Sequence, residues 1–267
     1  MNRIDTTFQR LRREGRAAFI AYLCAGDPDS GTIEALVAAL AGVGADIIEL
    51  GIPFSDPIAD GPVIQRASAR ALRGGFSPDD ALALVRRIRR RGIETPLVFM
   101  TYFNPVHAVG VRRFIRNMAA AGADGIIVPD LPPEEGRELA REGRAAGVKT
   151  IFLLAPTTTP ARTRAVLGIS TGFLYYVSVT GITGARKTLP VALASAVRAV
   201  RRRTKTPVCV GFGISRPQQV RAVARFADGV IVGSALVAAA EQNVKRGRKT
   251  VVAAVTRLAR RLRAALE

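Results

Sequence analysis

The sequence predicts a single α/β domain over residues 1–267, folded as a closed (β/α)8 TIM barrel with an extra N-terminal helix. Three observations support this prediction. Short apolar runs recur along the whole chain, segments with helical spacing separate them, and no linker or change of composition divides the chain. The length of 267 residues, with 48% hydrophobic and 23% charged residues, is typical of a globular protein with a large core.

The predicted strands are rich in β-branched residues and almost continuously apolar. They are AAFIAYL at 17–23, ADIIEL at 45–50, PLVFMT at 96–101, GIIVP at 125–129, TIFLLA at 150–155, GFLYYVS at 172–178, PVCVGFG at 207–213 and GVIVGS at 229–234. Such strands are buried on both faces, which indicates a parallel sheet covered by helices. A doubly wound open sheet is the alternative, but eight successive units favour a closed barrel.

The segments between these strands have the spacing of amphipathic helices. In the stretch ALALVRRIRRRG, Leu82, Val85 and Ile88 share one face while arginines cover the other. Gly122 and Gly147 lie just before the next strand, where glycine commonly ends a helix.

The net charge of +19 comes from 40 basic and 21 acidic residues. A nucleic-acid-binding protein would concentrate this charge beside stacking aromatic residues, but here the arginines recur on helix faces and the chain has no Trp. We therefore expect no nucleic-acid partner. The positive field would help to attract an anionic substrate.

The chain has no apolar run of the roughly 18 residues that a membrane span needs, so we expect no membrane partner. The segment RLRREGR followed by AAFIAYLCAG imitates a signal peptide, but Leu23 before Cys24 does not suit a cleavage site. Cys24 and Cys209 lie in apolar runs and are too few for a disulfide framework or a zinc site. These features predict a cytoplasmic protein.

The segment IIELGIPFSDPIADGP at 47–62 carries three carboxylates at the end of a predicted strand. In a barrel the active site lies at the carboxyl ends of the strands, so this segment belongs to the catalytic face. Asp56 and Asp60 could simply form turns beside proline and glycine. Glu49 is harder to explain structurally, because a glutamate in a buried apolar strand is costly.

Hydrophobic neighbours would raise the pKa of Glu49 by excluding water. Leu23, Tyr102 and Tyr175 are the side chains that we expect around it, in what would be the substrate pocket. A glutamate with a raised pKa can transfer protons near neutral pH.

A phosphate site is predicted at the last two strands. The segments VGFGIS at 210–215 and IVGSAL at 231–236 each pass from a strand through glycine and serine into a helix. Gly213, Gly233 and Ser234 could surround an anion there, as phosphate sites of barrels often do. Glycine after a strand is also common in plain turns, so each segment alone is a weak signal.

Several other reaction types lack the residues they need. His107 is the only histidine, and we expect it in a surface loop, so the sequence predicts no metal site. A Schiff-base aldolase needs a lysine at the catalytic end of a strand, whereas Lys149 and Lys205 precede strands and Lys187 lies in a loop. The remaining candidates are carboxylates, including Asp130, which could also hold a neighbouring loop. The sequence therefore predicts acid–base chemistry on a phosphorylated substrate.

The whole chain resembles the tryptophan synthase alpha subunit family. ELGIPFSDPIADGP is the most specific motif, and RIDTTF, AYLCAGDP, MTYFNP, VPDLPPEE, YYVSVTGITGAR, GFGIS and IVGSAL support it in the family's order. The resemblance implies retro-aldol cleavage of indole-3-glycerol phosphate to indole and glyceraldehyde 3-phosphate, with Glu49 as general acid–base and Asp60 as the second catalytic carboxylate.

The resemblance also implies the remaining site residues and the partner. Thr183 matches the residue that positions Asp60 when its loop closes, Gly184 joins the phosphate ligands, and Tyr175 lies at the substrate pocket. Val179 replaces an arginine found in some members. No cofactor is expected in this chain. The expected partner is a beta subunit that carries pyridoxal phosphate, in an alpha2beta2 heterotetramer that uses the indole to make L-tryptophan.

Two other functions stay open at this point. The chain could be a free-standing lyase that releases indole, or a barrel without catalytic activity that activates a beta subunit or binds anions. An intact Glu49 and Asp60 argue against a barrel that has lost its activity.

Overall fold

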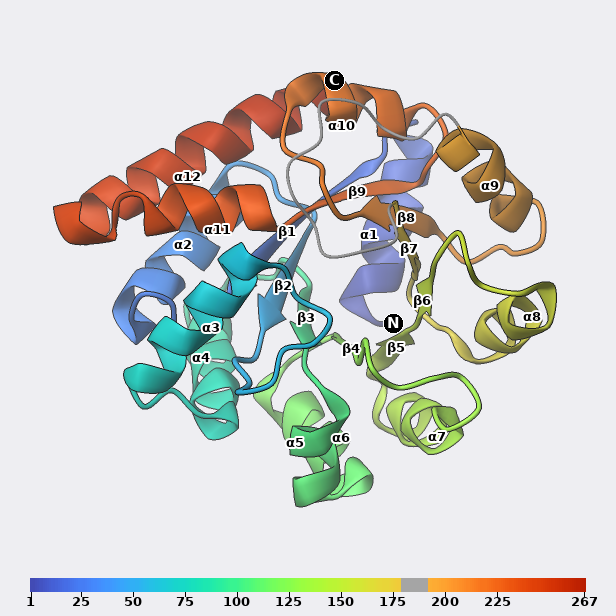
Figure 1. Ribbon diagram of the computed structural model, residues 1–267, viewed down its shortest axis with the longest axis horizontal. Coiled ribbons are helices and arrows are strands. Elements are labelled where there is room, and N and C mark those ends of the chain that lie inside the picture. Colours follow the sequence, from blue (N-terminus) through green and yellow to red (C-terminus); the bar gives the residue numbers. More distant parts are fainter. Residues whose placement is uncertain (179–191) are drawn as a thin grey trace.

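The computed structural model describes residues 1–178 and 192–267, and it confirms the predicted barrel. All strands of these two ranges belong to one sheet, and every described pairing is parallel. Helices form a ring around the strands (Figure 1). The strands are β1 (Ala18–Cys24), β2 (Ile47–Gly51), β3 (Leu97–Met100), β4 (Gly125–Ile127), β5 (Lys149–Ile151), β6 (Leu153–Leu154), β7 (Leu174–Val177), β8 (Val208–Gly211) and β9 (Gly229–Val232).

The helices alternate with the strands, as the sequence pattern predicts. They are α1 (Arg3–Arg13), α2 (Ser30–Gly42), α3 (Pro62–Arg73), α4 (Pro78–Arg90), α5 (Phe103–Val109), α6 (Val111–Ala121), α7 (Arg137–Ala146), α8 (Pro160–Ile169), α9 (Ala192–Arg201), α10 (Pro217–Ala224), α11 (Ser234–Glu241) and α12 (Arg248–Arg263), with 3-10 turns at Val244–Arg246 and Ala264–Leu266. In residues 1–178 and 192–267, none of these helices has the length and apolar character that crossing a bilayer requires.

The barrel closes within the fifth predicted strand, which the structure divides into β5 and β6. The sheet order runs β5-β4-β3-β2-β1-β9-β8-β7-β6, so its two ends are consecutive in the chain. Lys149–Ile151 pairs with β4, whereas Leu153 and Leu154 pair with β7. The strand is interrupted at Phe152 because its two halves pair with different neighbours.

The buried side chains form two layers, inside and outside the ring of strands. Alternate residues of one strand point to opposite faces of a sheet, so Ile48 and Leu50 of β2 join the outer layer against the helices. Ile47 joins the inner layer, which fills the barrel. Glu49 is two residues further along β2 and therefore also faces the interior.

Helix α1, the predicted N-terminal helix, covers the amino end of the barrel. Its Ile4, Phe8 and Leu11 pack into the inner layer. Asn2 caps this helix and donates hydrogen bonds to the carbonyls of Asp124 and Gly147, which lie just before β4 and β5. The opposite, carboxyl end of the barrel is therefore the end that is left for a substrate.

A repeated aspartate ties the amino ends of neighbouring strands together. In each case an Ala-Asp pair precedes a strand, and the carboxylate accepts an N–H from the first or second residue of the neighbouring strand. Each of these carboxylates also pairs with an arginine, so the charge is compensated where it is buried. The pairs are Phe19 N–H with Asp46 at 2.8 Å, Leu97 N–H with Asp124 at 2.8 Å and Val208 N–H with Asp228 at 2.9 Å.

Candidate active site

Glu49 lies inside the barrel near the carboxyl end of β2. It is 0% exposed, and neither carboxyl oxygen has a hydrogen-bond partner among the described residues. An ionised carboxylate in such a place is strongly destabilised, because no group replaces the water that it loses. Burial accordingly raises the pKa of Glu49 from 4.5 to about 8. Glu49 is therefore protonated at neutral pH and can give up its proton to a bound molecule.

Asp60 lies at the end of the loop from β2 to α3, one residue before the N-cap of α3. Burial raises the pKa of Asp60 to about 6, although a hydrogen bond from the Tyr102 hydroxyl, 2.9 Å from Oδ2, opposes this rise. The N–H of Ala59 donates to the same hydroxyl oxygen at 3.0 Å. Tyr102 also stacks on Phe54, with ring centroids 5.3 Å apart, so its hydroxyl is held in place. Asp60 is ionised near neutral pH, unlike Glu49.

A cavity opens between Asp60 and the ends of the last two strands. Its walls come from β1, the start of α3, and the ends of β3, β7, β8 and β9. The lining residues are Tyr22, Asp60, Gly61, Ile64, Met100, Tyr175, Phe212, Gly213, Gly233 and Ser234. The lining of the cavity is thus mostly apolar, and its polar groups come from Asp60 and from the glycine and serine residues that follow β8 and β9.

Two tyrosines of the cavity wall lie close to Glu49. Tyr22 and Glu49 are register partners on β1 and β2, so both point into the barrel. Burial raises the pKa of Tyr22 and of Tyr175, and the charges of Glu49 and Asp60 raise it further. Each ring lies over a glycine, Gly51 beneath Tyr22 and Gly211 beneath Tyr175, where any side chain would collide with the phenol. The absence of a side chain at Gly51 and Gly211 therefore makes room for the two phenol groups.

Leu23 does not line this cavity, contrary to the prediction. Side chains of β1 alternate, and Leu23 points outward into the layer between strands and helices. Tyr22, which the sequence reasoning missed, takes the expected place inside the barrel. The sequence contains little signal for this choice, because a strand inside a ring of helices is apolar on both sides.

Gly213, Gly233 and Ser234 come together in the wall of the cavity. Gly213 has a φ of 74°, a conformation that favours glycine. Gly233 is the N-cap of α11, and Ser234 is the first residue of that helix. The free N–H groups and the dipole of a helix N-terminus attract anions. This side of the cavity can therefore hold a phosphate group.

Phe212 is a second cavity residue that the sequence reasoning missed. It has a φ of 73°, which is rare for a residue with a side chain and costs on the order of 1 kcal/mol. This conformation places its ring against Tyr175 in an edge-to-face contact at 5.7 Å. Its position between two glycines in GFGIS is the only sequence signal for such a turn.

The other predicted residues lie as follows. Thr183, Gly184 and Val179 lie outside the described residues. Asp130 accepts the N–H of Phe103 at 2.9 Å, at the first residue of α5, and so holds a neighbouring loop as expected. His107 is exposed, as expected, but it belongs to α5 and not to a loop, and its ring is tilted against that of Phe103. Asp56 is exposed and accepts a hydrogen bond from the Ser55 hydroxyl.

Among residues 1–178 and 192–267, no three histidine, cysteine or acidic side chains are grouped as metal ligands would be.

Comparison with known proteins identifies the family. The family model described as "Tryptophan synthase alpha chain" matches residues 8–267. The tryptophan synthase alpha chain of Carboxydothermus hydrogenoformans is 48% identical over 92% of this chain and 91% of the relative. A crystal structure of the alpha chain from Legionella pneumophila superposes with a TM-score of 0.91 at 39% identity, covering 100% of this chain and 97% of that one.

A chain of the tryptophan synthase a2b2 complex from Pyrococcus furiosus is also similar. Its TM-score is 0.86 at 40% identity, over 93% of this chain and 98% of that one. A barrel, a cavity lined by Asp60 and by tyrosines that adjoin the buried Glu49, and similarity over nearly the whole length therefore agree. The chain belongs to the tryptophan synthase alpha chain family, whose members are lyases that act on indole-3-glycerol phosphate.

Proposed function

We propose that this chain cleaves indole-3-glycerol phosphate to indole and glyceraldehyde 3-phosphate, with Glu49 and Asp60 as its catalytic groups. The observation that carries this proposal is the contrast between two nearby carboxyl groups. Burial raises the pKa of Glu49 to about 8, whereas Asp60, held by Tyr102, has a pKa of about 6. Between these values one group is a proton donor and the other is an anion, which is the pairing that acid–base catalysis needs.

The reaction can proceed in two proton transfers. Protonated Glu49 gives its proton to C3 of the indole ring, and positive charge develops at the ring nitrogen. Ionised Asp60 stabilises that charge. The Glu49 carboxylate then takes the proton of the side-chain hydroxyl next to C3, the carbon–carbon bond breaks, and the aldehyde and indole form. Glu49 ends in its initial protonated state.

The shape of the cavity supports this substrate. Tyr22, Met100 and Tyr175 provide an apolar wall for a flat indole ring near Glu49. Gly213, Gly233 and Ser234 lie where the phosphate would bind, at the amino end of α11. We also assign Thr183 and Gly184 to substrate binding on the basis of the family motif, and Tyr102 to the positioning of Asp60. Leu23 has no contact with the cavity that would support a role in binding.

We propose a beta subunit as the partner, in an alpha2beta2 heterotetramer. The Pyrococcus furiosus relative is described as an a2b2 complex with mutual activation. In this chain the loop from β2 to α3 carries Ile58, which is 77% exposed, close to Asp60. An exposed isoleucine beside a catalytic group suits a surface that a partner covers. The partner would hold the pyridoxal phosphate for L-tryptophan synthesis, and this chain would need no cofactor.

Two general expectations also stay proposals. We propose that residues 1–267 form one domain, because every described strand belongs to one sheet. We propose a cytoplasmic location, because the reaction belongs to amino-acid biosynthesis.

An indole-release assay tests this function and separates it from the alternatives. Purified chain is supplied with indole-3-glycerol phosphate, with and without its cognate beta subunit. We expect slow cleavage by the chain alone and strong activation by the partner, on the order of 10²-fold if docking corrects the position of Asp60 by about 1 Å. Full activity alone without any response to the partner would indicate a free-standing lyase. No cleavage under either condition would indicate a barrel without catalytic activity.

A further inference from the structure

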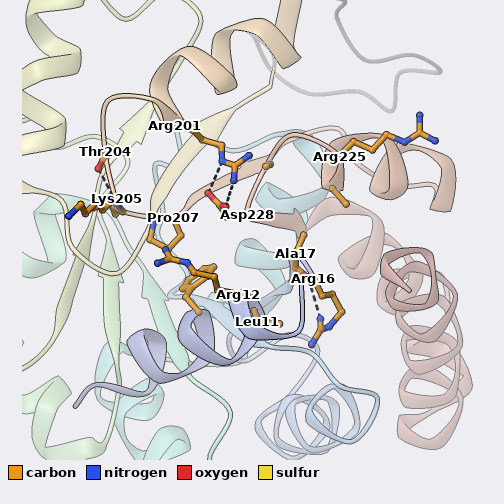
Figure 2. Close-up of a pocket in the computed structure, with 15 residues that line it drawn as sticks. Leu11, Arg12, Arg16, Ala17, Arg201, Thr204, Lys205, Pro207, Arg225 and Asp228 are labelled. Carbon is orange, nitrogen blue, oxygen red and sulfur yellow. Dashed lines mark hydrogen bonds and ion pairs between the residues drawn. The ribbon is translucent and has the colours of Figure 1, made fainter.

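A second cleft lies at the amino end of the barrel, opposite the catalytic cavity. It has a volume of about 560 Å³, within the range of small-molecule sites. Helix α1 forms one wall, and the segments that lead into β1, β8 and β9 form the other. Figure 2 shows this cleft. Its lining residues are Phe8, Leu11, Arg12, Gly15, Arg16, Ala17, Arg201, Thr204, Lys205, Thr206, Pro207, Ala224, Arg225, Ala227 and Asp228.

The cleft has a strong excess of positive charge. Five of its lining residues are basic and only Asp228 is acidic. Asp228 is already neutralised by Arg201, whose guanidinium lies 2.7 Å away in the middle of the cleft (Figure 2). Arg16 is likewise paired, with the buried Asp46 at 2.8 Å. In these two pairs the arginine neutralises a carboxylate that stabilises the fold. The other three basic residues of the cleft, Arg12, Lys205 and Arg225, have no acidic partner among the described residues.

Arg12, Lys205 and Arg225 make no ion pair or hydrogen bond with another described side chain. All three are exposed. They surround the cleft on three sides: Arg12 reaches from α1 toward Pro207, while Lys205 and Arg225 extend from opposite edges (Figure 2).

The cleft also offers hydrogen-bond donors that its own structure does not use. Arg201 donates three N–H groups, to Asp228 and to the carbonyl of Phe226, which leaves two of its five donors. The Thr204 hydroxyl accepts the N–H of Thr206 and keeps its own proton available. Guanidinium and hydroxyl donors beside free cations are the groups that bind phosphate oxygens.

We propose that this cleft binds a small polyanion carrying two or more linked phosphate groups. A single phosphate cannot reach cations on three sides of a cleft of this size, whereas a linear polyphosphate can. Arg201, fixed by Asp228, would contact its centre, and the long side chains of Lys205 and Arg225 would rotate inward to its ends. This site is separate from the catalytic phosphate site, which lies at the other end of the strands.

Calorimetric titration with inorganic tripolyphosphate tests the proposal. The protein is first saturated with glycerol 3-phosphate, which occupies the phosphate site at the catalytic end. We expect tripolyphosphate still to bind with one-to-one stoichiometry. The triple variant Arg12→Gln, Lys205→Gln, Arg225→Gln should bind it roughly 10- to 100-fold more weakly, because each lost cation removes a charge-assisted contact.

A matched control separates a built site from the overall charge. Arg112, Arg113 and Arg116 are exposed on α6 and form no ion pair among the described residues. Their replacement by Gln therefore removes an equal number of positive charges away from the cleft. The control variant should bind tripolyphosphate like the parent. Equal weakening in both triple variants would overturn the proposal in favour of nonspecific attraction. Absence of binding, or its complete loss in glycerol 3-phosphate, would also overturn it, and neither result would affect the proposed lyase activity.

Discussion

The hydroxyl of Tyr102 donates a hydrogen bond to Oδ2 of Asp60 at 2.9 Å, and its oxygen accepts the N–H of Ala59 at 3.0 Å. Tyr102 is the N-cap of α5, while Asp60 lies in the loop after β2. This contact joins the ends of two neighbouring strands and fixes the carboxylate. Because the hydroxyl donates to the ionised form, it also lowers the pKa of Asp60 against the effect of burial.

Replacement of Tyr102 by Phe should move the acid side of the activity profile to higher pH. Without the donated hydrogen bond the pKa of Asp60 rises, by up to about one unit, and a higher pH is needed to keep the group ionised. The measurement is kcat/KM for indole-3-glycerol phosphate between pH 5 and pH 9. Tyr176→Phe is the matched control, because that hydroxyl lies in the outer layer. An unchanged acid limb in Tyr102→Phe would show that the contact does not govern Asp60.

The parent enzyme should have a bell-shaped dependence of kcat/KM on pH. Activity requires ionised Asp60, with a pKa of about 6, and protonated Glu49, with a pKa of about 8. The rate should therefore rise up to about pH 6, stay level, and fall above about pH 8. A profile that keeps rising through pH 9 would mean that Glu49 does not act as the proton donor.

Replacement of Ser234 by Ala should weaken substrate binding rather than the chemical step. Ser234 begins α11 at the proposed phosphate site of the cavity and takes no part in the proposed proton transfers. A lost hydrogen bond to a charged group costs roughly 1.5–3 kcal/mol, so KM should rise about tenfold or more with kcat little changed. Ser195→Ala on the exposed face of α9 is the control. A fall in kcat at constant KM would place Ser234 in the wrong role.

Replacement of Glu49 by Gln should stabilise the fold at alkaline pH. The folded-state pKa of about 8 lies above the ordinary value of 4.5, so the native state binds the proton more tightly than the unfolded state. Glu49 therefore lowers the free energy of unfolding progressively between about pH 4.5 and pH 8, by up to about 5 kcal/mol. In urea unfolding, the variant should match the parent near pH 5 and exceed it at pH 8.5. Equal pH dependence would show that Glu49 is not buried as described.

The barrel could be predicted from the sequence because the continuous apolar pattern of its strands does not depend on which segments pack against them. Apolar runs such as those of β2 and β8 are buried on both faces, and only a parallel sheet within helices provides that burial. The interruption at Phe152 was not predictable, since it depends on which neighbour each half of the strand pairs with.

Site residues could be predicted where a charged side chain lies in a buried apolar strand. They were missed where the direction of the side chain decides whether it reaches the cavity. A glutamate in an apolar strand is anomalous in any context, so Glu49 was found from sequence. Leu23 and Tyr22 differ only in the face of β1 on which they lie, and both faces of that strand are apolar. Phe212 points into the cavity through a backbone conformation that sequence rarely specifies.

Indole release by Glu49→Gln is the most direct test of the central claim. The amide keeps the size of the side chain but cannot transfer a proton, and general acid–base catalysis contributes about 10²–10⁴-fold. With indole-3-glycerol phosphate and saturating cognate beta subunit, we expect the rate of indole release to fall by at least about 10²-fold, while binding of glycerol 3-phosphate is retained. Activity within a few-fold of the parent would contradict the assignment of Glu49 as the proton donor and acceptor.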